Sequence, residues 1–181
     1  FMSSKIKNHY GVMPCGAGKT FSGLKIAEFI GVTTLIIVDE TMLSDQWEED
    51  VLKECNFPRE RLGIVHGKKK DYKDKDVVIA TKQTLSSAKV LRDYLVERTS
   101  CLIVDECHTA PTKVYTDVIA HFKPKFRLGL TATPNRQDGQ QFLLDNYIGP
   151  RHFIATQREL YALGSTLEPT VITYCILEKT P

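Results

Sequence analysis

Residues 10–20 read YGVMPCGAGKT, and this stretch decides the fold because an apolar strand, a glycine-rich loop and the start of a helix follow one another in it. Backbone N–H groups of such a loop point inward and bind phosphate oxygens, and the N-terminus of the next helix favours the same negative charge. A glycine-rich turn with an incidental lysine is the alternative. The order of strand, loop and helix favours phosphate binding.

Each position of this loop has an expected role. Lys19 would contact the β- and γ-phosphates of a nucleotide, and the Thr20 hydroxyl would bind Mg²⁺. The full G-x-x-x-x-G-K-[ST] pattern is not met, because Met13 stands where the first glycine would be. The nucleotide-binding residues that we predict are Pro14, Cys15, Gly16, Ala17, Gly18, Lys19 and Thr20.

Apolar runs on either side of the loop predict the rest of the sheet. They are continuous rather than alternating, which is typical of parallel strands buried on both faces. These runs lie at residues 10–13, 34–38, 62–65, 77–80, 101–104 and 127–130. Amphipathic stretches predict helices over residues 19–30 and around Leu43, Trp47 and Val51. We therefore expect an α/β fold with a mostly parallel central sheet and helices on both faces, in three layers.

Three segments have weaker patterns. Residues 67–76 (GKKKDYKDKD) form a run of mixed charge between two strands, for which we expect a solvated loop; contact with phosphates is the alternative. Asp138 and Gln141 resemble a capping box that opens a third helix. Residues 157–163 predict a helix, and residues 170–177 predict a strand.

A second motif indicates what happens to the bound phosphate. Residues 102–108 read LIVDECH, so an apolar strand ends in the carboxylates of Asp105 and Glu106. Ligands of α/β sheets bind at this edge, where parallel strands have their carboxyl ends. Asp105 suits a second contact to Mg²⁺, and Glu106 suits the base that orients an attacking water. The pair favours hydrolysis over transfer to another acceptor.

Another Asp-Glu pair, Asp39 and Glu40, also ends an apolar run, only 20 residues after Lys19. It lacks a histidine two positions later and precedes the helix expected around Trp47. We interpret it as a strand-end loop and not as the metal site.

The third motif is LTATP at residues 130–134. The Thr131 and Thr133 hydroxyls could bond to His108 and to the carboxylates, which would link the nucleotide state to neighbouring surfaces. On its own this tripeptide would be read as a structural turn. Because it follows the two earlier motifs in this order along the chain, it becomes a specific signal for the same kind of site.

Composition excludes several classes of protein. The chain has 181 residues, 42% of them hydrophobic, and 24 Lys and Arg against 22 Asp and Glu leave a net charge of +2. This rules out a strongly basic nucleic-acid coat but not a local basic groove. No apolar run approaches the length of a membrane span, and no secretory signal is visible. The five cysteines are odd in number and include no C-x-x-C pair, so we expect an intracellular protein, cytoplasmic, nuclear or nucleoid, and not a secreted one.

Taken together, the motifs resemble those of the first RecA-like domain of superfamily 2 helicases and translocases. Residues 14–20 resemble its motif I, residues 105–108 the DExH form of motif II, and residues 130–134 motif III. Residues 35–47 resemble motif Ia, and residues 78–85 the nucleic-acid motif that follows. The stretches DECHTAPTKVY, RLGLTATPNRQDG and NYIGPRHF are most similar to the XPB-type and phage-repair-type branch.

The resemblance implies a RecA-like P-loop NTPase that uses ATP and Mg²⁺ to move on or unwind duplex or branched DNA. It implies that Lys19, Asp105 and Glu106 act in ATP hydrolysis and that Thr20 and Asp105 hold the metal. By the same resemblance, His108, Thr131 and Thr133 couple hydrolysis to movement. The positions implied to meet nucleic acid are Thr41, Thr81, Gln83 and Arg136. Asp39 and Glu40 depart from the family's usual Pro-Thr, and their charge would repel phosphates.

We expect residues 1–150 to form the ATP-binding domain and residues 151–181 to lead toward a second RecA-like domain outside this chain. By the resemblance, that domain supplies an arginine finger, so this chain alone would be a weakly active half of a motor. The alternatives are the translocase domain of a restriction-type nuclease, an RNA helicase, a non-motor nucleotide-binding module and a small-molecule kinase. We expect DNA rather than RNA as the partner, and no membrane.

Overall fold

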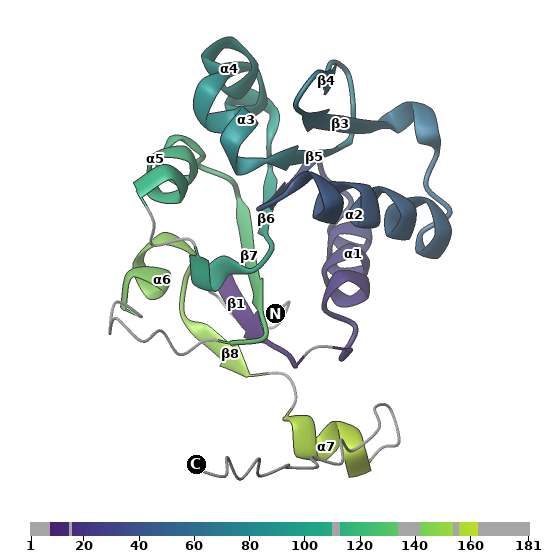
Figure 1. The fold of residues 1–181 in the computed structure, drawn as a ribbon, viewed down its shortest axis with the longest axis vertical. Coiled ribbons are helices and arrows are strands. Elements are labelled where there is room, and N and C mark those ends of the chain that lie inside the picture. The colour runs from purple at the N-terminus through teal and green to yellow at the C-terminus, as the bar shows by residue number, and fades with distance from the viewer. Residues whose placement is uncertain (1–7, 15, 110–112, 134–141, 154–155, 163–181) are drawn as a thin grey trace, which may run out of the picture.

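The computed structural model describes residues 8–14, 16–109, 113–133, 142–153 and 156–162. Eight strands form one sheet in the order β4-β3-β5-β2-β6-β7-β1-β8 (Figure 1). The strands are β1 (Asn8–Val12), β2 (Thr34–Val38), β3 (Leu62–His66), β4 (Lys69–Asp71), β5 (Val77–Thr81), β6 (Cys101–Val104), β7 (Phe126–Thr131) and β8 (Arg151–Phe153). Every neighbouring pair is parallel except β3 and β4. The predicted mostly parallel sheet is therefore confirmed.

Helices cover both faces of this sheet (Figure 1). The α-helices are α1 (Lys19–Ile30), α2 (Thr41–Glu54), α3 (Lys82–Ser87), α4 (Lys89–Arg98), α5 (Lys113–His121), α6 (Phe142–Tyr147) and α7 (Gln157–Ala162). Two 3₁₀ turns lie at Arg59–Arg61 and Cys107–Thr109. Helices α1 and α2 pack on one face, and α3, α4, α5 and α6 pack on the other.

The sheet is buried on both sides because its strands carry apolar residues at consecutive positions. In β2, Leu35 and Ile37 face the core under α3 to α6, whereas Ile36 and Val38 face the core under α1 and α2. All four side chains are fully buried. This is the reason that the strand runs were continuous rather than alternating in the sequence.

One expectation for the sheet was wrong. Residues 67–76, expected to be a loop, contain the short strand β4, which pairs antiparallel with β3. Gly67 has a φ of 49°, in the left-handed region that glycine adopts readily, and so the chain can reverse tightly after His66. All three β4 residues are exposed. Because all three residues are polar, the apolar pattern used to predict strands could not detect this strand at the edge of the sheet.

Other expectations fall at the limits of the described residues. Strand β8 pairs with β1, so the sheet continues to Phe153, while the predicted boundary at residue 150 stays a prediction. Helix α7 lies within the predicted helix 157–163. Asp138, Gln141 and residues 170–177 lie outside the described residues. Within the described part of the chain, no helix has the length and apolar character that crossing a membrane requires.

Candidate nucleotide-binding site

The predicted motifs meet at one edge of the sheet because their strands are neighbours. Strands β6, β7 and β1 are adjacent and parallel, so their carboxyl ends lie side by side. Residues 13–20 follow β1, Asp105 and Glu106 follow β6, and Thr131 ends β7. Three segments far apart in sequence are thereby brought together where α/β sheets bind ligands.

The loop after β1 has the backbone of a phosphate cradle. Gly16 and Gly18 have φ values of 78° and 76°, which a side chain would disfavour. The Ala17 N–H donates to the Pro14 carbonyl at 3.1 Å, which closes a tight turn. Gly18 then caps helix α1, whose first N–H groups have no partner within the helix. Cys15 lies outside the described residues.

Lys19 and Glu106 form an ion pair across the site, with Lys19 Nζ 3.0 Å from Glu106 Oε1. Their side chains are only 13% and 29% exposed. Glu106 has a φ of 43°, and a residue other than glycine in this region stores strain on the order of 1–3 kcal/mol. The backbone is thus held in a costly conformation at the residue for which sequence predicted the catalytic role.

The contacts of Glu106 continue to the third motif. Glu106 Oε2 lies 3.2 Å from His108 Nδ1, and this nitrogen lies 2.9 Å from the Thr131 hydroxyl. Thr131 is fully buried, and its hydroxyl oxygen also accepts the backbone N–H of Thr133 at 3.2 Å. One chain of contacts therefore runs from Lys19 through Glu106 and His108 to Thr131. The predicted contact between His108 and Thr131 is present.

Asp105 is held by two donors. Its Oδ1 accepts the backbone N–H of Glu106 at 2.9 Å, and its Oδ2 accepts the indole N–H of Trp47 at 2.8 Å. Burial raises the pKa of the Asp105 carboxyl, an effect that the Trp47 hydrogen bond opposes. Sequence reasoning used Trp47 only as an apolar helix position. The signal that could have found its role is chemical, because a buried indole N–H needs an acceptor.

A cavity of about 670 Å³ opens between this loop, α2 and the end of β6. Its lining includes Gly16, Lys19, Thr20, Asp105 and Glu106. Thr20 and Asp105 supply oxygen donors, which Mg²⁺ prefers; it is usually bound by one or two carboxylates together with phosphates. No group of three or more His, Cys, Asp or Glu side chains that could hold a metal occurs among the described residues. This donor set fits a metal that arrives with a nucleotide.

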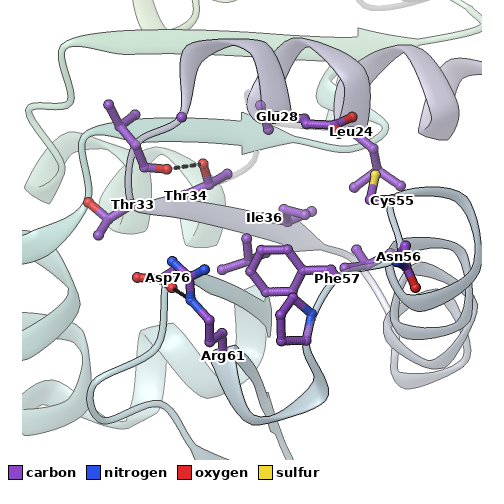
Figure 2. A pocket seen from close by; sticks show the side chains of 16 residues that line it. Leu24, Glu28, Thr33, Thr34, Ile36, Cys55, Asn56, Phe57, Arg61 and Asp76 are labelled. Atoms are coloured by element: carbon purple, nitrogen blue, oxygen red, sulfur yellow. Dashed lines mark hydrogen bonds and ion pairs between the residues drawn. The ribbon is translucent and has the colours of Figure 1, made fainter.

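A second cavity, of about 370 Å³, lies at the opposite edge of the sheet, where β2 and β5 begin (Figure 2). Figure 2 shows Leu24, Ile36 and Phe57 on its apolar part and the ion pair of Arg61 with Asp76 at its side. It contains none of the residues of the glycine-rich loop. The residues that sequence predicted to bind phosphate therefore line the first cavity and not the second.

Comparison with known proteins identifies the family. Residues 2–136 match the model of the family described as "Type III restriction enzyme, res subunit". The chain belongs to this family. Its relatives include the DNA 3'-5' helicase XPB of Kineococcus radiotolerans, 31% identical over 158 residues, and the DNA 3'-5' translocase XPB2 of Sulfurisphaera tokodaii, 36% identical over 149 residues. The alignments cover 84% and 82% of this chain but only 28% and 32% of those relatives.

Solved structures of helicases share the fold of this family member. The UvsW helicase of bacteriophage T4 superposes with a TM-score of 0.70 at 20% identity, covering 82% of this chain and 55% of UvsW. The Hef helicase domain of Pyrococcus furiosus superposes with a TM-score of 0.71 at 23% identity, covering 82% of this chain and 35% of Hef. The chain has the RecA-like fold of a superfamily 2 helicase's first domain.

The other Asp-Glu pair has a different environment in this family member. Asp39 pairs with Lys82 at the start of α3, and Lys82 Nζ lies 4.8 Å from the centre of the Tyr115 ring. Glu40 is exposed and precedes the first turn of α2. The arrangement agrees with a strand-end turn rather than a metal site. Because Lys82 offsets the Asp39 charge, the expected repulsion of phosphates is reduced.

The four residues predicted to meet nucleic acid differ in their placement. Thr41 and Gln83 are exposed, and they follow β2 and β5, which are adjacent strands. Thr81 is instead buried, and its hydroxyl lies 3.0 Å from that of Thr84, so its side chain joins β5 to α3. Arg136 lies outside the described residues. Of the three that the structure describes, Thr41 and Gln83 therefore expose their side chains, whereas Thr81 does not.

Proposed function

We propose that this chain is the ATP-binding and ATP-hydrolysing motor domain of a DNA helicase or translocase. The observation that carries the proposal is the continuous set of contacts from Lys19 through Glu106 and His108 to Thr131. It joins a phosphate-binding loop, a candidate base and a strand-end threonine. The names of the relatives, which are DNA helicases and translocases, support the same reading.

Nucleotide binding would begin with an exchange of partners by Lys19. Its Nζ now contacts Glu106, and it would move to the β- and γ-phosphate oxygens of ATP while the loop N–H groups bind the same phosphates. Thr20 and Asp105 would hold Mg²⁺, which, when bound, neutralises phosphate charge. Once the Lys19 ammonium group has moved to the phosphates, the Glu106 carboxylate would be free to act on water.

Glu106 would then orient a water molecule and accept its proton as the water oxygen attacks the γ-phosphorus. The bond from that phosphorus to the bridging oxygen breaks, so ADP and phosphate leave. His108, which lies between Glu106 and Thr131, would sense this change. Its contact with Thr131 gives a route from the nucleotide to β7 and Thr133, which is the proposed coupling role.

The partners in this proposal are DNA and a second RecA-like domain of the same protein, which would complete the ATP site with an arginine finger. Residues 1–150 would be the ATP-binding domain, and residues 151–181 would lead to the second one. Thr41 and Gln83 are the exposed candidates for contact with the DNA backbone. A DNA substrate places the protein inside the cell.

The family name also fits the translocase domain of a restriction nuclease. The names of the aligned relatives do not favour that alternative, because they describe DNA helicases and translocases. An RNA substrate is the other alternative, and the test below separates it from DNA. A non-motor nucleotide-binding module or a small-molecule kinase would not need a coupling route from the nucleotide to Thr131. The contact between His108 and Thr131 therefore favours the motor over both.

The test is phosphate release from Mg·ATP by the chain, with duplex DNA, forked DNA, single-stranded DNA and RNA in parallel. The Lys19→Ala variant gives the blank. We expect slow hydrolysis above the blank that a DNA raises more than RNA does. If RNA alone stimulated hydrolysis, RNA would replace DNA as the proposed substrate. Transfer of phosphate to a metabolite instead of water would contradict the proposal of a motor domain.

A further inference from the structure

Trp47 lies at the centre of the candidate site although it comes from a helix with no catalytic motif. It is the only tryptophan in the sequence, and it sits on α2, 58 residues before Asp105. Its indole N–H donates to Asp105 Oδ2 at 2.8 Å. Trp47 is 1% exposed and Asp105 is 7% exposed, so water does not compete for this hydrogen bond.

The ring of Trp47 is fixed from the other side by the helix that follows the phosphate-binding loop. A Cβ atom built on Gly23 of α1 would lie 3.4 Å from Trp47 Cη2, so the glycine makes room for the indole. The same Cβ would lie 2.9 Å from Leu130 Cδ1. Trp47 is thus wedged between α1 and the end of β6, and its rotamer is set by packing.

The two hydrogen bonds on Asp105 fix the plane of its carboxylate. The Glu106 N–H holds Oδ1 from the backbone, and the Trp47 N–H holds Oδ2 from α2. Each oxygen keeps further acceptor capacity, because a carboxylate oxygen has two lone pairs. A metal can therefore bind Asp105 without breaking either bond. Groups that orient a metal ligand in this way raise metal affinity.

We propose that Trp47 is a positioning residue that holds Asp105 in the orientation needed to bind the metal of Mg·ATP and Mg·ADP. This rests on the proposed function, in which Asp105 is a metal ligand. The competing view is that Trp47 only fills the space between α1 and α2. The two views differ in one atom, because packing depends on the ring and positioning depends on the indole N–H.

The decisive variant replaces the Trp47 indole by benzothiophene, through incorporation of 3-benzothienylalanine at position 47. Sulfur takes the place of the N–H while the ring keeps nearly the same size. Two affinities are measured by titration calorimetry, that of ADP in EDTA and that of Mn²⁺·ADP. We expect Mn²⁺·ADP to bind about tenfold more weakly than to the unmodified chain, as when an outer partner of a metal ligand is removed, and ADP in EDTA to bind unchanged.

Two further variants serve as controls for this measurement. Val51→Ala removes a buried side chain one turn further along α2, which lines the second cavity and not the one beside Asp105, so it should lower the melting temperature and leave both affinities unchanged. Asp105→Asn should remove most of the preference for Mn²⁺·ADP. Equal Mn²⁺·ADP affinity in the benzothiophene and indole chains would overturn the positioning role. If the unmodified chain binds ADP and Mn²⁺·ADP equally well, the metal site itself, and with it the proposed function, fails instead.

The unmodified chain offers a test that needs no substitution at position 47. Because it has one tryptophan, its tryptophan fluorescence reports on Trp47 alone. We expect Mg·ADP to change this emission, ADP in EDTA to change it less, and Asp105→Asn to abolish the difference. The same emission with and without metal would contradict the proposal even if the benzothiophene chain did not fold.

Discussion

Glu106 is the residue on which the candidate chemistry turns. Its carboxylate lies between Lys19 Nζ and His108 Nδ1, at 3.0 Å and 3.2 Å. In the proposed mechanism, Lys19 holds the Glu106 carboxylate until ATP draws Lys19 to its phosphates, and Glu106 then acts on water. Glu106 also has a positive φ, so the backbone is strained at a residue that lines the cavity.

Glu106→Gln should reduce ATP turnover by a factor on the order of 10²–10⁴, because the amide cannot accept the proton of the attacking water. Mg·ATP binding should stay the same or tighten, because Lys19 loses its competing anionic partner. Phosphate release and equilibrium binding measure the two effects separately. Glu40→Gln is the matched control from the other Asp-Glu pair and should leave both unchanged. Loss of turnover in that control alone would reverse the assignment.

Cys101 gives a prediction about pH. Burial raises the pKa of its thiol from 9.0 to about 11, against an opposing hydrogen bond with Thr34. The folded chain thus holds this proton more tightly than the unfolded chain does. The free energy of unfolding should be insensitive to this thiol below pH 9 and should fall as the pH rises from 9 toward 11, by about 2 kcal/mol.

Urea denaturation of the chain and of Cys101→Ala, compared across this pH range, measures that change. The difference between the two isolates Cys101 from the buried Cys107, whose pKa burial also raises. The wild-type chain should lose stability relative to the variant as the pH rises. A constant difference would show that the Cys101 thiol is not buried as described.

At the scale of elements, one set of contacts links the end of β2 to α3 and α5. In it, Lys82 of α3 pairs with Asp39 and lies over the ring of Tyr115. The side chains of Asp39 and Lys82 are 22% and 18% exposed, so their ion pair is less screened than a surface pair. Combining Asp39→Asn and Lys82→Gln in a double-mutant cycle should give a coupling of about 1 kcal/mol in the free energy of unfolding. The exposed pair of Lys25 and Glu28 on α1 is the control and should give a clearly smaller coupling, because water and salt screen it. Equal couplings would contradict the account.

The elements that sequence predicted are those whose signal is local. Strand β6 is apolar at every position, β2 is apolar from Leu35 to Val38, and α1 runs from Lys19 to Ile30 as expected. Helices α3, α4 and α5 were not predicted. Helix α3 has only six residues and α4 is rich in charge, whereas α5 has apolar residues at helical spacing, Tyr115, Val118 and Ile119, that sequence reasoning missed. Strand β4 (KKD) has no apolar residue, and only its pairing with β3 makes it a strand.

The features of the candidate site also fall into two groups, those that sequence could predict and those that it could not. The loop, the Asp-Glu pair and the threonines could be found because each motif carries its chemistry in a few adjacent residues. The hydrogen bond of Trp47 to Asp105 could not, because it depends on how α2 packs between α1 and β6. The environment of the Thr81 side chain was likewise not visible in the sequence. Its motif placed it near nucleic acid, whereas the strand end turns its hydroxyl inward to Thr84.

At the scale of the molecule, the chain spans 28% and 32% of two XPB relatives that it matches. A protein that joins this chain to a second RecA-like domain should hydrolyse ATP at least about 10³-fold faster in the presence of DNA, because an arginine finger would stabilise charge in the transition state. The rates of the two proteins with the same DNA give the comparison. Equal rates would mean that the site needs no second domain.

We expect the cavity beside Lys19 and Trp47 to bind a nucleotide. Energy transfer from Trp47, the only tryptophan, to the fluorophore of N-methylanthraniloyl-ADP tests it most directly, because transfer requires the nucleotide to lie close to this side chain. We predict saturable transfer with Mg²⁺ that unlabelled ATP displaces and that Lys19→Ala weakens at least about tenfold, which corresponds to 1.4 kcal/mol. Transfer of equal strength in Lys19→Ala, or none in the unmodified chain, would contradict the account.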